Sequence, residues 1–386
     1  KTMNGYLDNR KAGWDTHGLP VELAVEKSLG ITKEDIGKKI SVKEYNDACR
    51  KEVMKYTGEW ENLTRRMGYW VDMNDPYITY DSRYIETLWF LLKELYKKDY
   101  LYKGYTIQPY SPAAGTGLST HELNQPGAYR DVKDTTCIAQ FRMKNPKPEM
   151  AQFGDAYFLA WTTTPWTLPS NTALAVGADI TYVAVQSYNP YTGDKMTVVA
   201  AKALMFSLFS EKAKDIALED YKQGDKLIPY KVVGEWKGSE LAGMEYEQLF
   251  PWVNPGNNAF KVLTGDFVTT EDGTGIVHIA PTFGADDAKV AKANGVPPMM
   301  LLDKDGNQRP MVDLTGKYFR IEDLDPAFVK EKVNVDLYKE FAGRYVKNEY
   351  DNTLPADAPT LDVDLSVSLK AANKVFRLER HVHNYP

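Results

Sequence analysis

The sequence predicts an α+β protein in which a mainly helical N-terminal segment precedes a β-rich domain with a barrel-like arrangement of strands. Three observations lead to this prediction. Apolar residues recur at helical spacing over residues 1–100, many short apolar runs follow from about residue 105, and Gly, Pro, Asn and Asp separate those runs. Short strands at such spacing are typical of barrels and sandwiches.

Helices account for most of residues 1–100. A short strand and turn are expected first, then a helix over 21–29 that Gly30 closes as its C-cap. Ser41 and Glu44 form a capping-box pattern that opens a long helix ending near Arg66. A further helix over 82–98 carries apolar side chains at helical spacing, namely Ile85, Leu88, Leu91, Leu92 and Leu95.

Strands dominate from about residue 105. The apolar or alternating runs that predict them lie at 105–110, 135–143, 156–163, 181–187, 196–201, 229–236, 260–264, 275–280 and 298–303. Helices are expected near 202–214, 284–294 and 326–341. A polar stretch at 348–359 with Pro355 and Pro359 is interpreted as a linker, and a helix (361–372) and a strand (374–382) follow it.

Composition and charge limit the function classes. The 386 residues are 43% apolar and 26% charged, which is ordinary for a globular protein. No stretch approaches the roughly 18 apolar residues of a membrane helix, and no secretory h-region is evident, so a cytoplasmic location without a membrane partner is expected. The net charge of -6 argues against broad, non-specific binding of nucleic acid. It is compatible with a site that receives only the end of an RNA.

The first of three segments that could carry chemistry covers residues 13–22 and reads GWDTHGLPVE. Asp15, Thr16 and His17 lie in a tight turn that enters a helix, where free backbone N–H groups favour anions. A capped helix start without further role explains the same pattern equally well.

The second segment covers residues 161–171 and reads WTTTPWTLPSN. Thr162, Thr163 and Thr164 bring hydroxyl groups and freed backbone amides around one point at a strand end. Pro165 then prevents further ladder pairing. The alternative is a threonine-rich strand end closed by a local hydroxyl-to-backbone turn.

The third segment covers residues 273–287 and reads GTGIVHIAPTFGADD. His278 lies on an apolar strand, and a glycine turn leads to a helix that begins with Asp286 and Asp287. Carboxylates suit a helix N-terminus, which explains one of them but does not require both. A single strand histidine is commonly a satisfied core residue, and this alternative stays open.

No metal site is expected. The two cysteines are too few for a cysteine-based zinc site, and the five histidines form no His-Glu-x-x-His pattern. His381 and His383 would point the same way from a strand, but no third ligand is evident near them.

Together and in this order, the three segments resemble the class I aminoacyl-tRNA synthetases, and among these the isoleucine enzymes. Residues 13–20 resemble the stretch that follows the ATP-binding helix of the catalytic domain. Residues 161–171 and 273–287 resemble the two signatures of the inserted editing domain, and residues 381–386, HVHNYP, resemble the return to the catalytic domain. The resemblance covers nearly the whole chain. It implies part of the catalytic domain and a connective segment at 1–134, the β-rich editing domain at 135–347, and a return linker and strand at 348–386.

Two positions favour the isoleucine branch. Valine and leucine relatives tend to have Thr-Thr-Arg-Pro where this chain has threonine at position 164, and valine enzymes tend to have lysine at the place of His278. An editing domain of the valine or leucine subclass remains the alternative.

The resemblance also implies a role for each candidate residue. Thr167 and His278 would form the wall of an amino-acid pocket, with Trp166 nearby. Asp287 would pair with the α-ammonium group of the substrate, and Asp286 would support the same loop. The ester, the terminal adenosine and an attacking water would be held by Thr162, Thr163, Thr164 and Asn171. The residues expected to take part in catalysis are Thr163, Thr164, His278 and Asp287.

The activity implied is hydrolysis of valine wrongly esterified to isoleucine tRNA, with valyl-adenylate as a further candidate substrate. The expected partners are the 3' aminoacyl end of that tRNA, valine, and the rest of the synthetase chain. No cofactor is expected for this hydrolysis. The family's HIGH-type and KMSKS-type motifs are not in the sequence. The resemblance therefore assigns ATP with Mg to the full-length enzyme only, and Asp15 and His17 to a partial synthetic site that does not charge tRNA by itself.

Two rival hypotheses belong to other classes. In the first, the chain binds the end of the tRNA but does not hydrolyse the ester. In the second, it is a structural insertion with no role of its own.

Overall fold

The computed structural model describes residues 1–386 except 105, 113, 349–350, 352, 356–357 and 386. The chain divides into two compact units, Lys1–Tyr105 (unit 1) and Thr106–Pro386 (unit 2). Residue 105, the first of the strand expected at 105–110, lies outside the described part. Of the described positions in that range, only Tyr110 is in a strand, because β3 covers Tyr110–Ser111.

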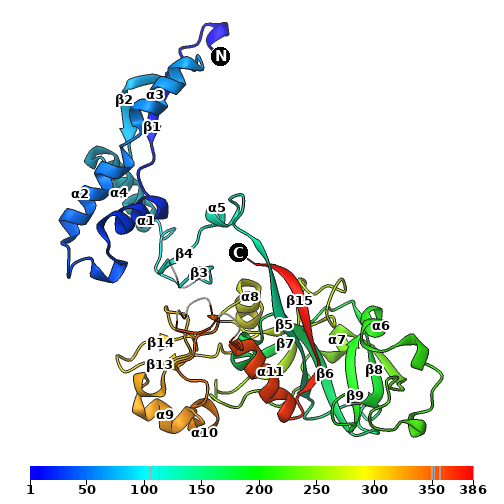
Figure 1. Cartoon of the computed structure of the whole chain (residues 1–386). Coiled ribbons are helices and arrows are strands. Elements are labelled where there is room, and N and C mark those ends of the chain that lie inside the picture. The colour runs from blue at the N-terminus through cyan, green and yellow to red at the C-terminus, as the bar shows by residue number, and fades with distance from the viewer. Residues whose placement is uncertain (105, 113, 349–350, 352, 356–357, 386) are drawn as a thin grey trace. The chain divides into compact units, whose positions relative to one another are not determined.

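Unit 1 joins helices to a parallel pair of strands (Figure 1). The strands are β1 (Lys11–Trp14) and β2 (Asp72–Ile78), and β2 was not predicted. The helices are α1 (Leu19–Leu29), α2 (Val42–Val53), α3 (Thr57–Arg66) and α4 (Ser82–Lys97), with 3-10 turns η1 (Thr2–Asn4) and η2 (Lys33–Asp35).

The helix ends of unit 1 follow the local signals. Gly30 ends α1 in the left-handed region at φ 65°, where glycine has no steric penalty. The capping box is confirmed: the Ser41 hydroxyl accepts from the Glu44 N–H at 3.2 Å, and the Glu44 carboxylate accepts from the Ser41 N–H at 3.1 Å. The single helix expected up to Arg66 is wrong, because residues 54–56 separate α2 from α3.

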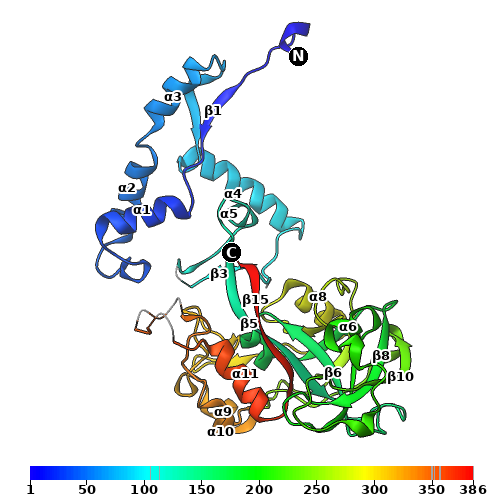
Figure 2. The ribbon, with the colours of Figure 1, turned by 45° about the vertical axis from the view of Figure 1, so that its right-hand side comes forward.

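A six-stranded sheet in the order β10-β8-β9-β6-β5-β15 forms the larger layer of unit 2. Its strands are β5 (Arg130–Arg142), β6 (Asp155–Thr162), β8 (Thr181–Tyr188), β9 (Lys195–Ala201), β10 (Lys231–Lys237) and β15 (Val375–Tyr385). Neighbours are antiparallel except β6 and β9. β15 runs along β5 in both Figure 1 and Figure 2, and the register of this pair extends from Val375↔Ala139 to Tyr385↔Arg130.

A second sheet, in the order β11-β7-β12, packs against the first. It consists of β7 (Ala173–Val176), β11 (Lys261–Thr264) and β12 (Ile276–Ile279). Its central strand β7 was not predicted. Leu174 belongs to the main core cluster, as Phe158 of β6 does, whereas Ala173 belongs to a small cluster that includes Ala291 of the helix α8 (Ala285–Ala293). The three-stranded sheet thus lies between the large sheet and α8.

The remaining elements of unit 2 are short. The strands are β3 (Tyr110–Ser111), β4 (Thr116–Gly117), β13 (Leu301–Leu302) and β14 (Gln308–Arg309). The helices are α5 (Thr120–Leu123), α6 (Met205–Leu208), α7 (Gly238–Leu241), α9 (Pro326–Lys332), α10 (Val335–Tyr338) and α11 (Leu361–Ala371). The 3-10 turns are η3 (Pro165–Ser170), η4 (Lys202–Leu204), η5 (Glu211–Ala213), η6 (Leu218–Asp220) and η7 (Ile321–Asp323).

The α+β class is confirmed, and the described strands form open sheets rather than a closed barrel. β10 and β15 are the two edges of the large sheet. The helices expected at 202–214 and 326–341 are each broken into shorter pieces. Among the described residues, no helix combines the length and the apolar character needed to cross a membrane.

Candidate functional site

The threonine segment begins where β6 ends. The Thr162 hydroxyl accepts from the Thr164 N–H at 3.1 Å, so the local turn considered from the sequence is present. Pro165 then occupies the first position of η3, where a missing N–H leaves no bond unmade. The Thr167 hydroxyl, one turn further, donates to the Thr164 carbonyl at 2.9 Å. The segment is therefore a tightly folded turn with defined hydroxyl directions.

The histidine segment begins with β12, which pairs with β7 so that His278 lies opposite Leu174. The chain then turns into α8, and the Asp287 carboxylate folds back to accept from the Ala280 N–H at 2.8 Å. Gly284 leaves room for this contact, because a Cβ there would lie only 2.6 Å from Asp287 Cγ. Asp286 is exposed.

The structure brings the two segments together. Thr167 Oγ1 lies 3.0 Å from His278 Nε2, although 111 positions separate the two residues in the sequence. The Trp166 and Phe283 rings pack edge to face with centroids 4.9 Å apart. These contacts join η3 to both β12 and the turn before α8.

The protonation of His278 follows from its neighbours. The single hydroxyl proton of Thr167 is used on the Thr164 carbonyl, so Nε2 of the ring must be the donor toward Thr167 Oγ1. Nδ1 is then an unprotonated acceptor, and it is buried without a partner among the described residues. Burial lowers the pKa of His278 to about 4, so the ring is neutral near pH 7.

Four buried polar atoms of these segments have no hydrogen-bond partner in the described part of the chain. They are His278 Nδ1, Trp166 Nε1, Ser170 Oγ and Thr282 Oγ1. Buried polar groups are nearly always paired, so each unpaired atom marks a place where a water molecule or a ligand could bind. They offer one acceptor, one donor and two hydroxyl groups that can donate or accept.

Asp287 supplies a charge at the same place. Burial raises the pKa of its carboxyl group above the usual range, the Ala280 N–H opposes this, and the nearby Asp286 charge adds to it. No cation is within ion-pair distance of Asp287 in the described structure. A positively charged ligand group would relieve this unfavourable charge.

Asn171 is committed to protein groups. Its amide nitrogen donates to the Ala173 carbonyl at 2.7 Å, and its oxygen accepts from the Tyr246 hydroxyl at 2.6 Å. The residue is 2% exposed. It therefore holds the end of η3 against β7.

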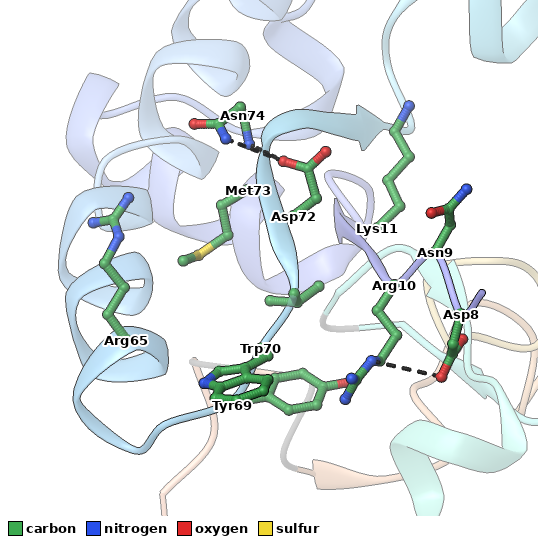
Figure 3. Close-up of a pocket in the computed structure, with 11 residues that line it drawn as sticks. Asp8, Asn9, Arg10, Lys11, Arg65, Tyr69, Trp70, Asp72, Met73 and Asn74 are labelled. Carbon is green, nitrogen blue, oxygen red and sulfur yellow. Dashed lines mark hydrogen bonds and ion pairs between the residues drawn. The ribbon is translucent and has the colours of Figure 1, made fainter. Parts of the chain in front are cut away.

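Asp15 and His17 belong to unit 1, whereas the residues above belong to unit 2. The Thr79 hydroxyl contacts the Thr16 N–H and hydroxyl and His17 Nδ1, all at 2.8–2.9 Å. Unit 1 also has an open hollow of about 860 Å³ (Figure 3). Its lining consists of Asp8, Asn9, Arg10, Lys11, Arg65, Tyr69, Trp70, Val71, Asp72, Met73 and Asn74, none of which was predicted as a site residue.

Residues that sequence reasoning missed also shape the site. Phe283 and Thr282 lie within the third segment but carry no recognisable signal of their own. Tyr246 and Asp362 reach the site from distant positions, so only the folded chain reveals them. Among the described residues, no group of three or more His, Cys, Asp or Glu side chains could hold a metal ion.

Comparison with known proteins identifies the family. The model of the class I tRNA synthetases (I, L, M and V) matches residues 1–354. The isoleucine--tRNA ligase of Bacteroides fragilis (strain ATCC 25285) is 71% identical over 386 residues, which cover 100% of this chain and 34% of that protein. The enzyme of the same name from Porphyromonas gingivalis is 69% identical, with 100% and 34% covered. The chain thus spans about a third of the length of these relatives.

Among solved structures, the editing domain of the P. knowlesi cytosolic leucyl-tRNA synthetase is 12% identical, with a TM-score of 0.36, and the match covers 63% of this chain and 95% of that one. This similarity is too low to add to the assignment. The family model and the identity to isoleucine--tRNA ligases agree with the resemblance drawn from the three motifs. The chain belongs to the class I tRNA synthetases of the isoleucine, leucine, methionine and valine group.

Proposed function

We propose that unit 2 is an editing hydrolase that removes valine from wrongly charged isoleucine tRNA, acting as part of an isoleucine--tRNA ligase. The observation that carries the proposal is the contact between Thr167 and His278, with the partly buried carboxylate of Asp287 on the same segment. Thr167 and His278 form a boundary for a small aliphatic side chain, and Nδ1 of His278 is a neutral acceptor. Asp287 adds a negative charge that no cation of the described residues neutralises.

The physical problem is the single methylene that distinguishes isoleucine from valine. This difference is worth about 1–3 kcal/mol in an apolar pocket, a figure for which the isoleucine enzymes are themselves the standard example. A site sized for isoleucine cannot exclude the smaller valine. A second site can admit valine and reject isoleucine if its wall does not yield.

Thr167 and His278 are suited to form such a wall. Their mutual hydrogen bond restrains both side chains, and Trp166 against Phe283 supports the wall from one side. Close-packed groups resist the insertion of an extra methylene, which costs about 1–3 kcal/mol when neighbours must shift. The rigidity of the wall is therefore what allows it to admit valine and reject isoleucine.

The substrate carries a free α-ammonium group, and we assign its recognition to Asp287. A charged donor on a carboxylate forms one of the stronger hydrogen bonds in proteins. The ammonium group would also offset the burial that raises the pKa of Asp287. Asp286 is exposed, so its role is limited to the electrostatic field of the loop.

The chemistry is proposed as direct attack of water on the ester carbonyl. The bond from the carbonyl carbon to the ribose oxygen breaks, valine leaves as the free acid, and the water proton passes to the ribose oxygen. The Thr163 and Thr164 hydroxyls orient the ester and the water, while Thr162 and Asn171 hold the turn that carries them. His278 is too weak a base at pKa about 4 to take a proton near pH 7, so its role is steric and hydrogen-bonding. No cofactor is needed for these steps.

The test is deacylation of valyl-tRNA by the purified chain and by Asp287→Asn, a variant of the same volume without the charge. A fall of about tenfold or more in kcat/KM is expected for the variant, since a charge-assisted contact is lost. Equal rates would remove Asp287 from the ammonium site. Thr167→Gly should open the wall, so continued strict sparing of isoleucyl-tRNA by this variant would contradict the steric argument.

The rival function is a module that binds the tRNA end without hydrolysis. The acidic net charge of -6 disfavours strong binding by phosphate contacts. Titration of valyl-tRNA with saturable binding and no release of valine would select this alternative. Charging of tRNA with ATP and Mg, and any part played by Asp15 and His17, are proposed only for the longer protein.

A further inference from the structure

A buried cluster of charged side chains adjoins the candidate site through Asp362. The Lys347 ammonium group lies 2.9 Å from Asp362 Oδ2 and 3.0 Å from Asp134 Oδ2. His383 Nε2 lies 3.1 Å from the same oxygen of Asp134. The Asp362 side chain is completely buried, and those of Lys347 and Asp134 are 10% and 12% exposed. The cluster joins β5, α11 and β15 to the segment that follows α10.

Asp362 extends from this cluster to the threonine segment. Its Oδ1 accepts from the Trp166 N–H at 2.8 Å, across 196 positions of sequence. Trp166 is the second residue of η3, and the first N–H groups of a helix have no partner within the helix. The Trp166 carbonyl accepts from the Tyr318 hydroxyl. This one residue of η3 is therefore held through both its backbone N–H and its carbonyl by side chains from elsewhere in unit 2.

The position of Trp166 determines where its neighbour Thr167 points. Thr167 follows directly, and its hydroxyl meets His278 Nε2 at 3.0 Å. Trp166 itself packs on Phe283. A shift of the Trp166 backbone would move both contacts, so Asp362 acts on the wall through the backbone of η3.

The charges in the cluster favour a geometric role over a stabilising one. Burial raises the pKa of Asp362, and Lys347 and the Trp166 N–H offset this only in part. Burial acts to lower the pKa of Lys347, but Asp362 and Asp134 outweigh it and hold the pKa above its usual range. Buried ion pairs seldom stabilise a fold more than apolar packing would. Unlike an apolar side chain, the Asp362 carboxylate provides a fixed acceptor for the Trp166 N–H.

We propose that Asp362 is a positioning residue of the editing site: its carboxylate, held by Lys347, fixes the Trp166 backbone and thereby the Thr167–His278 wall. This inference rests on the proposed function for its effect on hydrolysis, but the structural part stands without it. In this proposal Asp362 acts through the Trp166 backbone and needs no contact with the substrate.

Two double variants of the 386-residue chain separate the hydrogen bond from the charge. Asp362→Asn with Lys347→Gln removes both charges but keeps an acceptor for the Trp166 N–H, and the two amides can pair with each other. Asp362→Leu with Lys347→Gln has a similar volume and lacks that acceptor. The difference between them isolates the bond to Trp166.

The first readouts do not depend on activity. Nitrogen-15 NMR reports the tautomer of His278, and amide hydrogen exchange reports the protection of the Trp166 N–H. The asparagine variant should keep the Nε2-protonated ring and the protected amide. The leucine variant should lose the protection and show a mixture of ring tautomers. Retention of both signals in the leucine variant would overturn the inference, and so would their equal loss in the two variants.

Deacylation of valyl-tRNA supplies the second readout. The asparagine variant should stay within about threefold of the parent chain in kcat. The leucine variant should lose about a hundredfold in kcat with KM little changed, because misplacement of a positioning group acts on the reacting geometry. If the parent chain shows no hydrolysis, the proposed function fails while the NMR result still decides the inference. If neither variant folds, the parent chain decides it: a slowly exchanging Trp166 amide supports the bond to Asp362, and a rapidly exchanging one refutes it.

Discussion

Replacing His278 by glutamine should make unit 2 less sensitive to acid. Burial lowers the pKa of His278 to about 4 in the folded chain, against an unfolded value near 6.5. The unfolded state therefore binds more protons below pH 6.5, so the free energy of unfolding falls as the pH drops from 6.5 toward 4. Linkage over this interval gives a loss of about 2 kcal/mol at pH 5 and about 3 kcal/mol at pH 4 from this one ring. Glutamine does not titrate and removes this contribution.

The assay compares the parent chain and His278→Gln at pH 7.5 and pH 5. Urea-dependent hydrogen exchange of peptides from β7 and β12 reports the unfolding free energy of this unit alone. Other groups also titrate, but they are common to both proteins and cancel in the difference. The parent should lose about 2 kcal/mol more than the variant. An equal loss in the two proteins, or a His278 ring that titrates near pH 6.5 by NMR, would refute the burial argument and the neutral tautomer derived from it.

Three further perturbations test other contacts. Gly284→Ala should lower the rate of valyl-tRNA deacylation, because the new Cβ would lie 2.6 Å from Asp287 Cγ and displace the carboxylate. The melting temperature should change little, because alanine readily adopts the backbone φ of -117°. An unchanged rate would show that the carboxylate position is not critical. Tyr246→Phe should cost about 1–3 kcal/mol in urea unfolding, since the oxygen of Asn171 then loses its buried donor; a loss within error would contradict this. Thr167→Val keeps the volume of the side chain but removes its hydroxyl group, so this variant should still leave isoleucyl-tRNA intact. The His278 ring should show a mixture of tautomers by NMR, because Nε2 loses its acceptor. Hydrolysis of isoleucyl-tRNA by this variant would disprove the steric role.

The sequence was sufficient where signals are local. The capping box at Ser41 and the C-cap at Gly30 lie where predicted, and the expected strands of the large sheet correspond to β5, β6, β8, β9, β10 and β15. Each of these signals depends on residues a few positions apart. The ordered motifs likewise placed the chain in its family, because they combine fixed residues over nearly the whole sequence.

The sequence was insufficient where distant pairing decides. β7 is short and follows a proline-containing turn, and it exists because β11 and β12 pair with it from both sides. The helix expected at 326–341 is interrupted because Val333 bridges to Val253 and Asn334 caps a new helix by accepting from Leu337. Asp362 reads as an ordinary carboxylate in the first turn of a helix. Its bond to Trp166 depends on a fold that no local pattern encodes.

The long antiparallel ladder of β5 and β15 has a practical consequence. Arg130 and Tyr385 are register partners, so everything folded between these two positions starts and finishes at neighbouring points. Such a segment can be inserted into a host polypeptide without separating the host residues on either side, because its two ends are as close together as the ends of a hairpin turn. By the same logic, a short artificial turn grafted across that junction should excise the segment and leave the flanking sequences connected.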